Sequence, residues 1–290
     1  MSDSEYKYNI DSLTLKMCCP KLLFNQLSFL PSGLPLLRDG YNVSIIEKDT
    51  EYNPNIIYLQ LAFEENKSIG VIQCKKNEQE ALFYIDKEIF YSNAVDVRDA
   101  VFIEEIIKDL GFDPETVSVV NMTIVRDSLW DSISEIEKLT EQEGYYPVIY
   151  SKDSVNCYLT DYYYFGEPGM EDLNAKKLKK KKACILTNIL GSLNMRVFCL
   201  SEVIKDLTHE DYINEYNGTS KGKSHPVYRT EISFNDYQLQ QYFINKGVEY
   251  SGYYPLCQFF NPEILKDLFD FLKFRILFFV DKEKNEIIQI

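Results

Sequence analysis

Short runs in which apolar and polar residues alternate constrain the fold of this chain most. They occupy residues 12–17, 42–48, 56–63, 69–75 and 81–86, and Asn, Pro and charged residues separate them. Alternation with a period of two puts every second side chain on one face of a strand, and the polar breaks are typical of turns. Because consecutive strands joined by short connections usually pair, this part of the chain predicts an antiparallel meander.

Amphipathic helices are predicted after the meander. Residues 98–111 carry apolar side chains at helical spacing and end in Gly111, a common helix stop. A strand is expected over 116–127, followed by a second helix over 128–144 with Ser128 as its N-cap. Strands and helices therefore alternate irregularly, as in α+β proteins.

The second half of the chain predicts a similar order. Strands are expected near 155–165, near 183–199 and around Arg229, and helices near 208–218, from Asn235 and over 262–280. We therefore predict an α+β fold in which an antiparallel sheet has helices packed on one side. We expect residues 1–290 to form a single domain, which can consist of two similar strand–helix–strand halves, 1–150 and 151–290.

Composition and length are those of a globular protein. The chain has 290 residues, of which 45% are hydrophobic and 26% charged, enough for one large core or two small ones. It contains no apolar stretch near the roughly 20 residues of a membrane span, and its acidic, polar start does not resemble a secretory signal. We expect a cytoplasmic protein with no membrane partner. Its seven scattered cysteines are expected to be reduced core thiols.

The charge distribution bears on nucleic-acid binding. A net charge of −14 argues against a surface that binds nucleic acid all over, because phosphate affinity comes mainly from Lys and Arg. One local tract is strongly basic and contains Lys176, Lys177, Lys179, Lys180, Lys181 and Lys182. Two interpretations compete: the tract is a solvated loop that offsets nearby acids, or it is the one place that contacts phosphate.

A charged pair stands out in the strand "YRTEI". Arg229 and Glu231 are two positions apart, so both point to one face, whereas Tyr228, Thr230 and Ile232 point to the other. Structurally, the pair can be an ion pair on a solvent-facing strand, which contributes at most about 1 kcal/mol. Functionally, it can belong to an active site.

Four segments together resemble a known family. They read "DSLTLKM", "RDSLWDSISEIEKL", "RVFCLSEVIKDLTHEDYINEYNG" and "HPVYRTEISFND". Their order is similar to that in rolling-circle replication initiators of phages and plasmids, in particular those of the Bacteroidetes. In that family an aspartate closes a central strand, a Tyr-x-Lys-x-x-Glu strand bears the nicking tyrosine, and an Arg-x-Glu strand helps to form the metal-binding face.

Carried over by position, the resemblance implies catalytic roles for Asp127, Arg229 and Glu231, with Asp127 and Glu231 as ligands of Mg²⁺ or Mn²⁺. No other cofactor is implied. Phe198 stands where the nicking tyrosine belongs, and phenylalanine cannot attack a phosphodiester. Leu200 replaces the lysine of the same motif.

Other positions fit the family less well. Thr123 lies where a further acid is usual, and Glu202 falls only near the expected glutamate. The distant His209 and His225 do not form a His-hydrophobic-His metal motif and are expected to be surface or turn residues. Tyrosines at 162–164 and Tyr228 leave open a displaced nucleophile, although aromatic runs in strands are usually core or stacking surface.

The resemblance implies a DNA replication initiation protein that binds an origin hairpin or single strand, with weak or lost nicking activity. The lysine tract is the expected DNA-binding segment. The alternative is a pseudoenzyme of a phage or mobile element that uses the same scaffold to bind a protein partner through its acidic surface. A phage-encoded protein of either kind would act in the host cytoplasm.

Overall fold

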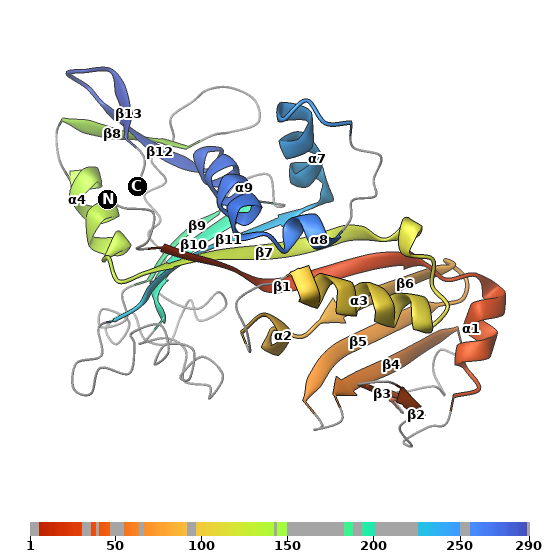
Figure 1. Cartoon of the computed structure of the whole chain (residues 1–290). Helices are drawn as coiled ribbons and strands as arrows, with labels where there is room; N and C mark the ends of the chain where they lie inside the picture. Colours follow the sequence, from red (N-terminus) through yellow and green to blue (C-terminus); the bar gives the residue numbers. More distant parts are fainter. Residues whose placement is uncertain are drawn as a thin grey trace. The chain divides into compact units, whose positions relative to one another are not determined.

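The computed structural model describes residues 6–30, 36–38, 41–46, 55–63, 67–91, 97–141, 144–149, 183–187, 193–200, 226–249 and 256–288. These form two compact units, each assembled from separate segments of the chain (Figure 1). Unit 1 comprises residues 1–9, 123–234 and 265–290, and unit 2 comprises residues 10–122 and 235–264. Strands β1 (Tyr6–Cys18) and β7 (Ser118–Ser128) contribute residues to both units.

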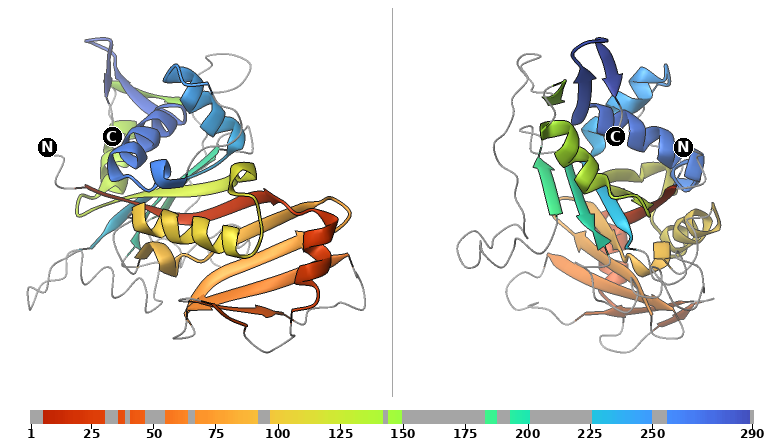
Figure 2. Two further views of the ribbon diagram at one scale, coloured as in Figure 1. Left: turned by 45° about the vertical axis from the view of Figure 1, so that its right-hand side comes forward. Right: turned by 90° about the vertical axis from the view of Figure 1, so that its left-hand side faces the viewer.

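Unit 2 contains the meander that the alternating runs predict. Its strands follow the order β2-β3-β4-β5-β6-β1, and each described pairing between neighbours is antiparallel. The strands after β1 are β2 (Leu36–Arg38), β3 (Tyr41–Ile45), β4 (Ile56–Phe63), β5 (Ser68–Lys75) and β6 (Glu80–Ile85). Figure 2 shows them as the red and orange arrows. The short strand β2 was not predicted from the sequence.

One glycine is required where β5 passes β6. Gly70 has φ +149°, and a Cβ added there would lie 2.2 Å from the backbone oxygen of Tyr84. The register of the β4–β5 pair shifts in the same place, between Leu61 and Ala62. A side chain at position 70 would therefore push the two strands apart.

Helices in unit 2 pack through apolar faces. They are α1 (Lys21–Leu27), α2 (Glu88–Tyr91), α3 (Val97–Asp109), the 3-10 turn η2 (Pro114–Thr116), α7 (Asp236–Asn245) and α8 (Leu256–Phe259). Phe102 of α3 stacks on Phe63 of β4, with ring centroids 5.4 Å apart, and meets the ring of Tyr41 at 6.4 Å. The prediction of an amphipathic helix over 98–111 is confirmed.

Unit 1 contains a second set of strands. β7 is followed in hydrogen-bonding order by β11 (Tyr228–Asn235), β10 (Leu193–Cys199) and β9 (Ala183–Thr187). A separate three-stranded sheet has the order β13 (Glu286–Ile288), β12 (Leu277–Asp281) and β8 (Tyr145–Ile149). Its described helices are α4 (Ser132–Glu141) and α9 (Pro262–Phe274), which begins at the boundary with unit 2.

The α+β class, with an antiparallel sheet and helices packed against it, is confirmed, but two helix boundaries differ from prediction. Ser128 is the last residue of β7 rather than an N-cap. The carboxylate of Asp131 caps α4 instead, because it accepts a hydrogen bond from Ser134 N at 3.0 Å. The helix expected over 262–280 ends at Phe274, and a tight turn leads into β12.

Some of the predicted elements lie outside the described residues, and other predictions can be compared with the structure. The strand expected near 155–165 and the helix near 208–218 lie outside the described residues. Cys19, Cys74 and Cys199 are buried free thiols, as expected, whereas Cys18 is an exposed free thiol. Among the described residues, no helix is long and apolar enough to cross a membrane.

Candidate functional site

The residues that the resemblance assigns to an active site lie on two neighbouring strands of unit 1. Asp127 lies near the end of β7, and Arg229 and Glu231 lie on the adjacent strand β11. Alternation puts Arg229 and Glu231 on the same side of β11. We call this side of the sheet the Arg229 face and the opposite side the Thr230 face.

Arg229 and Asp127 form a closed ion pair. Arg229 Nε donates to Asp127 Oδ1 and Arg229 Nη2 donates to Asp127 Oδ2, both at 2.7 Å. Both side chains have 0% exposure. The planar guanidinium therefore engages both oxygens of the carboxylate in the fork geometry that suits Arg best.

The solvent-facing position predicted for Arg229 is wrong. Arg229 is fully buried and forms a salt bridge with Asp127, 102 positions earlier in the chain. Alternation shows which residues of one strand share a face, but it does not show which residue of the neighbouring strand lies alongside. The pair is accordingly a core interaction rather than a weak surface one.

Strand β10 supplies further side chains of the Arg229 face. Phe198 lies directly opposite Arg229 in the β10–β11 register, and Arg196 lies directly opposite Glu231. Because directly opposed residues share a face, Phe198 and Arg229 point to the same side of the sheet. Phe198 has 0% exposure, and the Arg196 guanidinium carbon lies 4.4 Å from the centroid of its ring. The side chain at the expected nucleophile position is therefore packed as a core aromatic.

Thr123 makes a structural contact. It occupies the position where the initiator family usually has a further acid, and its hydroxyl lies 2.9 Å from that of Ser233 on β11. This hydrogen bond joins the same two strands as the Arg229–Asp127 pair. Thr123 and Asp127 of β7 thus both form side-chain hydrogen bonds with residues of β11.

Metal binding by Asp127 and Glu231 stays a prediction. A divalent ion at Asp127 would share or displace the two hydrogen bonds from Arg229, since both carboxylate oxygens already accept one. In the part of the chain that the structure describes, no cluster of three or more His, Cys, Asp or Glu side chains could hold a metal. The surroundings of Asp127 fit an Arg counter-ion better than an open metal site.

Several other positions discussed above lie outside the described residues. These are the lysine tract from Lys176 to Lys182, Glu202, His209, His225 and the tyrosines at 162–164. Leu200, at the position of the family's lysine, is fully buried. Tyr228 begins β11, where it is half-buried and opposite Cys199.

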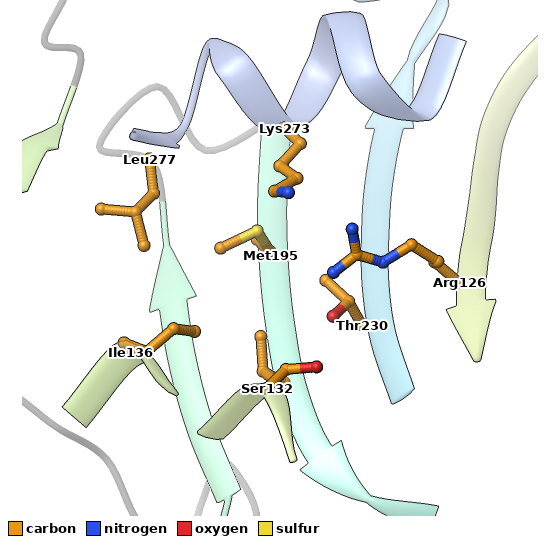
Figure 3. A pocket seen from close by; sticks show the side chains of 8 residues that line it. Arg126, Ser132, Ile136, Met195, Thr230, Lys273 and Leu277 are labelled. Atoms are coloured by element: carbon orange, nitrogen blue, oxygen red, sulfur yellow. The ribbon is translucent and has the colours of Figure 1, made fainter. Parts of the chain in front are cut away.

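A small cavity lies on the Thr230 face, which the sequence did not predict. Helix α9 brings Lys273 over this face, and Lys273, Arg126 of β7 and Thr230 of β11 line the cavity together with Ser132 of α4 (Figure 3). Lys273 is only 9% exposed. Its position within the apolar stripe of α9 was the available signal, because a lysine there has to be buried or reach along the helix to water.

Burial and nearby charges shift the pKa values of two side chains in this region, Lys273 and Asp270. Burial, followed by the repulsion of the nearby Arg126, lowers the pKa of Lys273 to about 7. Asp270 and Glu135 act in the opposite direction but do not restore the pKa of the lysine. Burial also raises the pKa of Asp270, against the attraction of Lys273 and Arg126. A strongly shifted lysine in a cavity marks this site as a candidate for binding.

Comparison with known proteins gives no assignment: no protein-family model matches the sequence, and no curated protein matches it either.

Proposed function

We propose that this chain is an initiator-like DNA-binding protein that has lost strand-nicking activity. The proposal rests on the order of the four family-like segments and on the chemistry of the Arg229 face. The environment of Phe198 is the observation that most supports the proposed loss of nicking. It is fully buried directly opposite Arg229, whose guanidinium is closed on Asp127.

Nicking requires groups that Phe198 and Asp127 do not offer. A hydroxyl nucleophile has to reach a phosphodiester, and a divalent ion needs carboxylate oxygens that are open to it. The phenyl ring of Phe198 has no hydroxyl, and Asp127 gives both oxygens to Arg229. These residues instead join β7, β11 and β10 into a stable sheet.

Binding of DNA without cleavage needs only cations that contact phosphate. The lysine tract from Lys176 to Lys182 supplies such cations in a chain with a net charge of −14. We infer that any DNA contact is local, through this tract, rather than spread over the acidic surface. The expected ligands are a DNA hairpin or single strand.

The binding experiment uses a labelled hairpin and a labelled single strand, with fluorescence anisotropy at low and moderate salt. Affinity should fall steeply as salt increases, because lysine–phosphate contacts release counterions. Replacement of Lys179, Lys180, Lys181 and Lys182 with Ser should weaken binding to both ligands. It should also flatten the salt dependence by about one unit of log–log slope for each phosphate that is no longer neutralised.

A matched control removes the same charge elsewhere. Lys21, Lys108, Lys138 and Lys284 are exposed and lie far from the tract in sequence, and they can be replaced with Ser together. This variant should bind almost as the unmodified protein does. Equally weakened binding in the two variants would mean that only net charge matters. Binding by neither protein nor variant at low salt would favour the alternative of a protein-binding scaffold.

A further inference from the structure

Two cysteines of unit 2 have their thiols in contact. Cys74 lies in β5, and Cys19 is the first residue after β1. The thiol of Cys74 donates a hydrogen bond to the sulfur of Cys19. Both residues have 0% exposure, and neither is in a disulfide. The fold therefore brings together two reduced sulfur atoms that are far apart in the sequence.

Strand β6 lies between the two cysteines, and a small residue of this strand leaves room for their contact. Cys74 is paired with Ala81 of β6, and Met17 of β1 is paired with the same alanine. The backbone N–H of Cys19 donates to the oxygen of Gln79 at 2.9 Å, so the chain is still bound to β6 after β1 ends. Burial alternates along this segment, which places Met17 and Cys19 on the face that Cys74 shares. On that face β6 presents only the methyl group of Ala81.

The hydrogen bond makes the two thiols chemically different. It lowers the pKa of Cys19, against the opposing effect of burial, because it favours the thiolate that accepts it. It raises the pKa of Cys74, and burial acts in the same direction. The thiolate is the reactive form of cysteine. Cys19 is therefore the nucleophile of the pair, and Cys74 stays protonated beside it.

Cys19 is buried at a place that a local motion can open. Its neighbours Cys18 and Pro20 are exposed, and α1 begins directly after Pro20. α1 has only seven residues, its N-cap Pro20 forms no side-chain cap hydrogen bond, and its first turn contains no acidic residue. A short helix without these stabilising groups opens locally at low cost. Such an opening gives a solute as small as hydrogen peroxide access to Cys19, whereas Cys74 lies between β4 and β6.

We propose that Cys19 and Cys74 are a peroxide-reactive pair that closes reversibly into a disulfide. The thiolate of Cys19 attacks one oxygen of hydrogen peroxide, the O–O bond breaks, and the hydroxide that leaves takes up the proton that Cys19 has lost. Cys19 is then a sulfenic acid. The sulfur of Cys74 attacks the sulfur of Cys19, the S–O bond breaks, and the hydroxyl group leaves with the thiol proton of Cys74 as water. One peroxide is thus reduced to two waters, and two thiols are oxidised to one disulfide.

This reaction is independent of the proposed DNA binding. Both cysteines belong to unit 2, whereas the Arg229 face and the lysine tract belong to unit 1. The disulfide would connect β5 to the link between β1 and α1. A dithiol reductant such as dithiothreitol would restore the two thiols by exchange.

The test uses the reduced full chain, hydrogen peroxide and mass spectrometry. After oxidation the protein is denatured in iodoacetamide, which alkylates the remaining thiols, and is digested with trypsin without reductant. Cys19 and Cys74 fall in the tryptic peptides 17–21 and 68–75. We expect these two peptides to be linked, with a mass lower by two hydrogen atoms than that of the separate peptides, and dithiothreitol should release them. Because Cys18 is in the first peptide, the crosslink should also form in Cys18→Ser.

Variants made in the Cys18→Ser protein separate the two roles. Cys74→Ala should abolish the crosslink and leave a sulfenic acid at Cys19, which dimedone labels. Cys19→Ala should abolish both the crosslink and the labelling, because Cys74 is buried and protonated. The control is Cys199→Ala, which removes a buried thiol of unit 1 and should leave the yield of crosslink unchanged. Thermal melting of each reduced variant checks that it is folded.

Two results would overturn the proposal. One is that Cys19 and Cys74 are both alkylated after the folded protein has been treated with peroxide. The other is a crosslink that is lost in Cys18→Ser or that forms only when the protein is unfolded in urea. Either result would leave Cys19 and Cys74 as hydrogen-bonded core thiols.

Discussion

Arg229 and Asp127 form a bidentate ion pair in the core of unit 1, with both hydrogen bonds at 2.7 Å and neither side chain exposed. The pair joins β11 to β7. Removal of one partner would take from the other a buried counter-ion that makes two hydrogen bonds to it, which is far more costly than the pair is stabilising.

The first prediction compares the removal of one partner of this ion pair with the removal of both. Asp127→Leu and Arg229→Met should each lower the free energy of unfolding by about 3 to 5 kcal/mol. The double variant should be destabilised by much less than the sum of the two, since it buries no charge. Urea unfolding of all four proteins measures the coupling.

A surface pair provides the control for the first prediction. Lys75 and Glu78 are 3.0 Å apart, and the side chain of Glu78 is 58% exposed. Glu78→Gln should change the free energy of unfolding by less than about 1 kcal/mol. Additive destabilisation in the Asp127/Arg229 double variant would show that the two side chains are stabilised independently of each other.

The second prediction concerns Phe198. Restoration of a tyrosine by Phe198→Tyr should not restore nicking, because the new hydroxyl would be buried opposite Arg229 rather than presented to DNA. Unless it finds a partner, burial of this hydroxyl should cost about 1 to 3 kcal/mol of stability. The variant can be incubated with Mn²⁺ and a supercoiled plasmid that carries the native origin. Relaxed or nicked plasmid would place position 198 in a working active site.

The third prediction concerns the pH dependence of stability. The pKa of Lys273 is about 7 in the folded protein, below its usual 10.5, so burial penalises the protonated form. Below pH 7 both folded and unfolded chains hold the proton, and the penalty is complete. Above pH 7 the folded chain releases the proton first, so stability rises with pH by up to about 1.4 kcal/mol per unit from this group.

Comparison with Lys273→Met isolates that contribution. Urea unfolding from pH 6 to pH 9 should show the variant gaining stability over the unmodified protein mainly at the acidic end, with the difference shrinking toward pH 9. Lys138→Met should show no such trend, because Lys138 is exposed. A constant difference for Lys273→Met across this range would mean that Lys273 does not titrate near pH 7.

Local sequence patterns predicted much of the fold. The run 56–63 coincides with β4, and the apolar spacing of residues 98–111 predicts α3 to within one or two residues. The end of α9 was missed because "RILFFV" continues the apolar character of the helix although it forms a turn and then β12. Apolar runs of this length do not distinguish a buried helix from a buried strand.

The candidate sites were harder to predict because they depend on pairing between distant strands. Alternation placed Arg229 and Glu231 on one face, but the partner of Arg229 lies 102 positions away and is set by the β7–β11 pairing. Lys273 was overlooked for a similar reason. Only the packing of α9 over β7, β10 and β11 brings it beside Arg126 and Thr230.

The most direct test of the proposed function asks whether DNA binding and nicking are separate in this protein. A labelled hairpin from the native origin is incubated with the protein and Mn²⁺ at low salt, and the sample is divided between a native and a denaturing gel. We predict a shifted complex on the native gel and free, uncut DNA on the denaturing gel. A covalent protein–DNA adduct on the denaturing gel would contradict the proposed loss of nicking and show that a side chain other than Phe198 cleaves DNA.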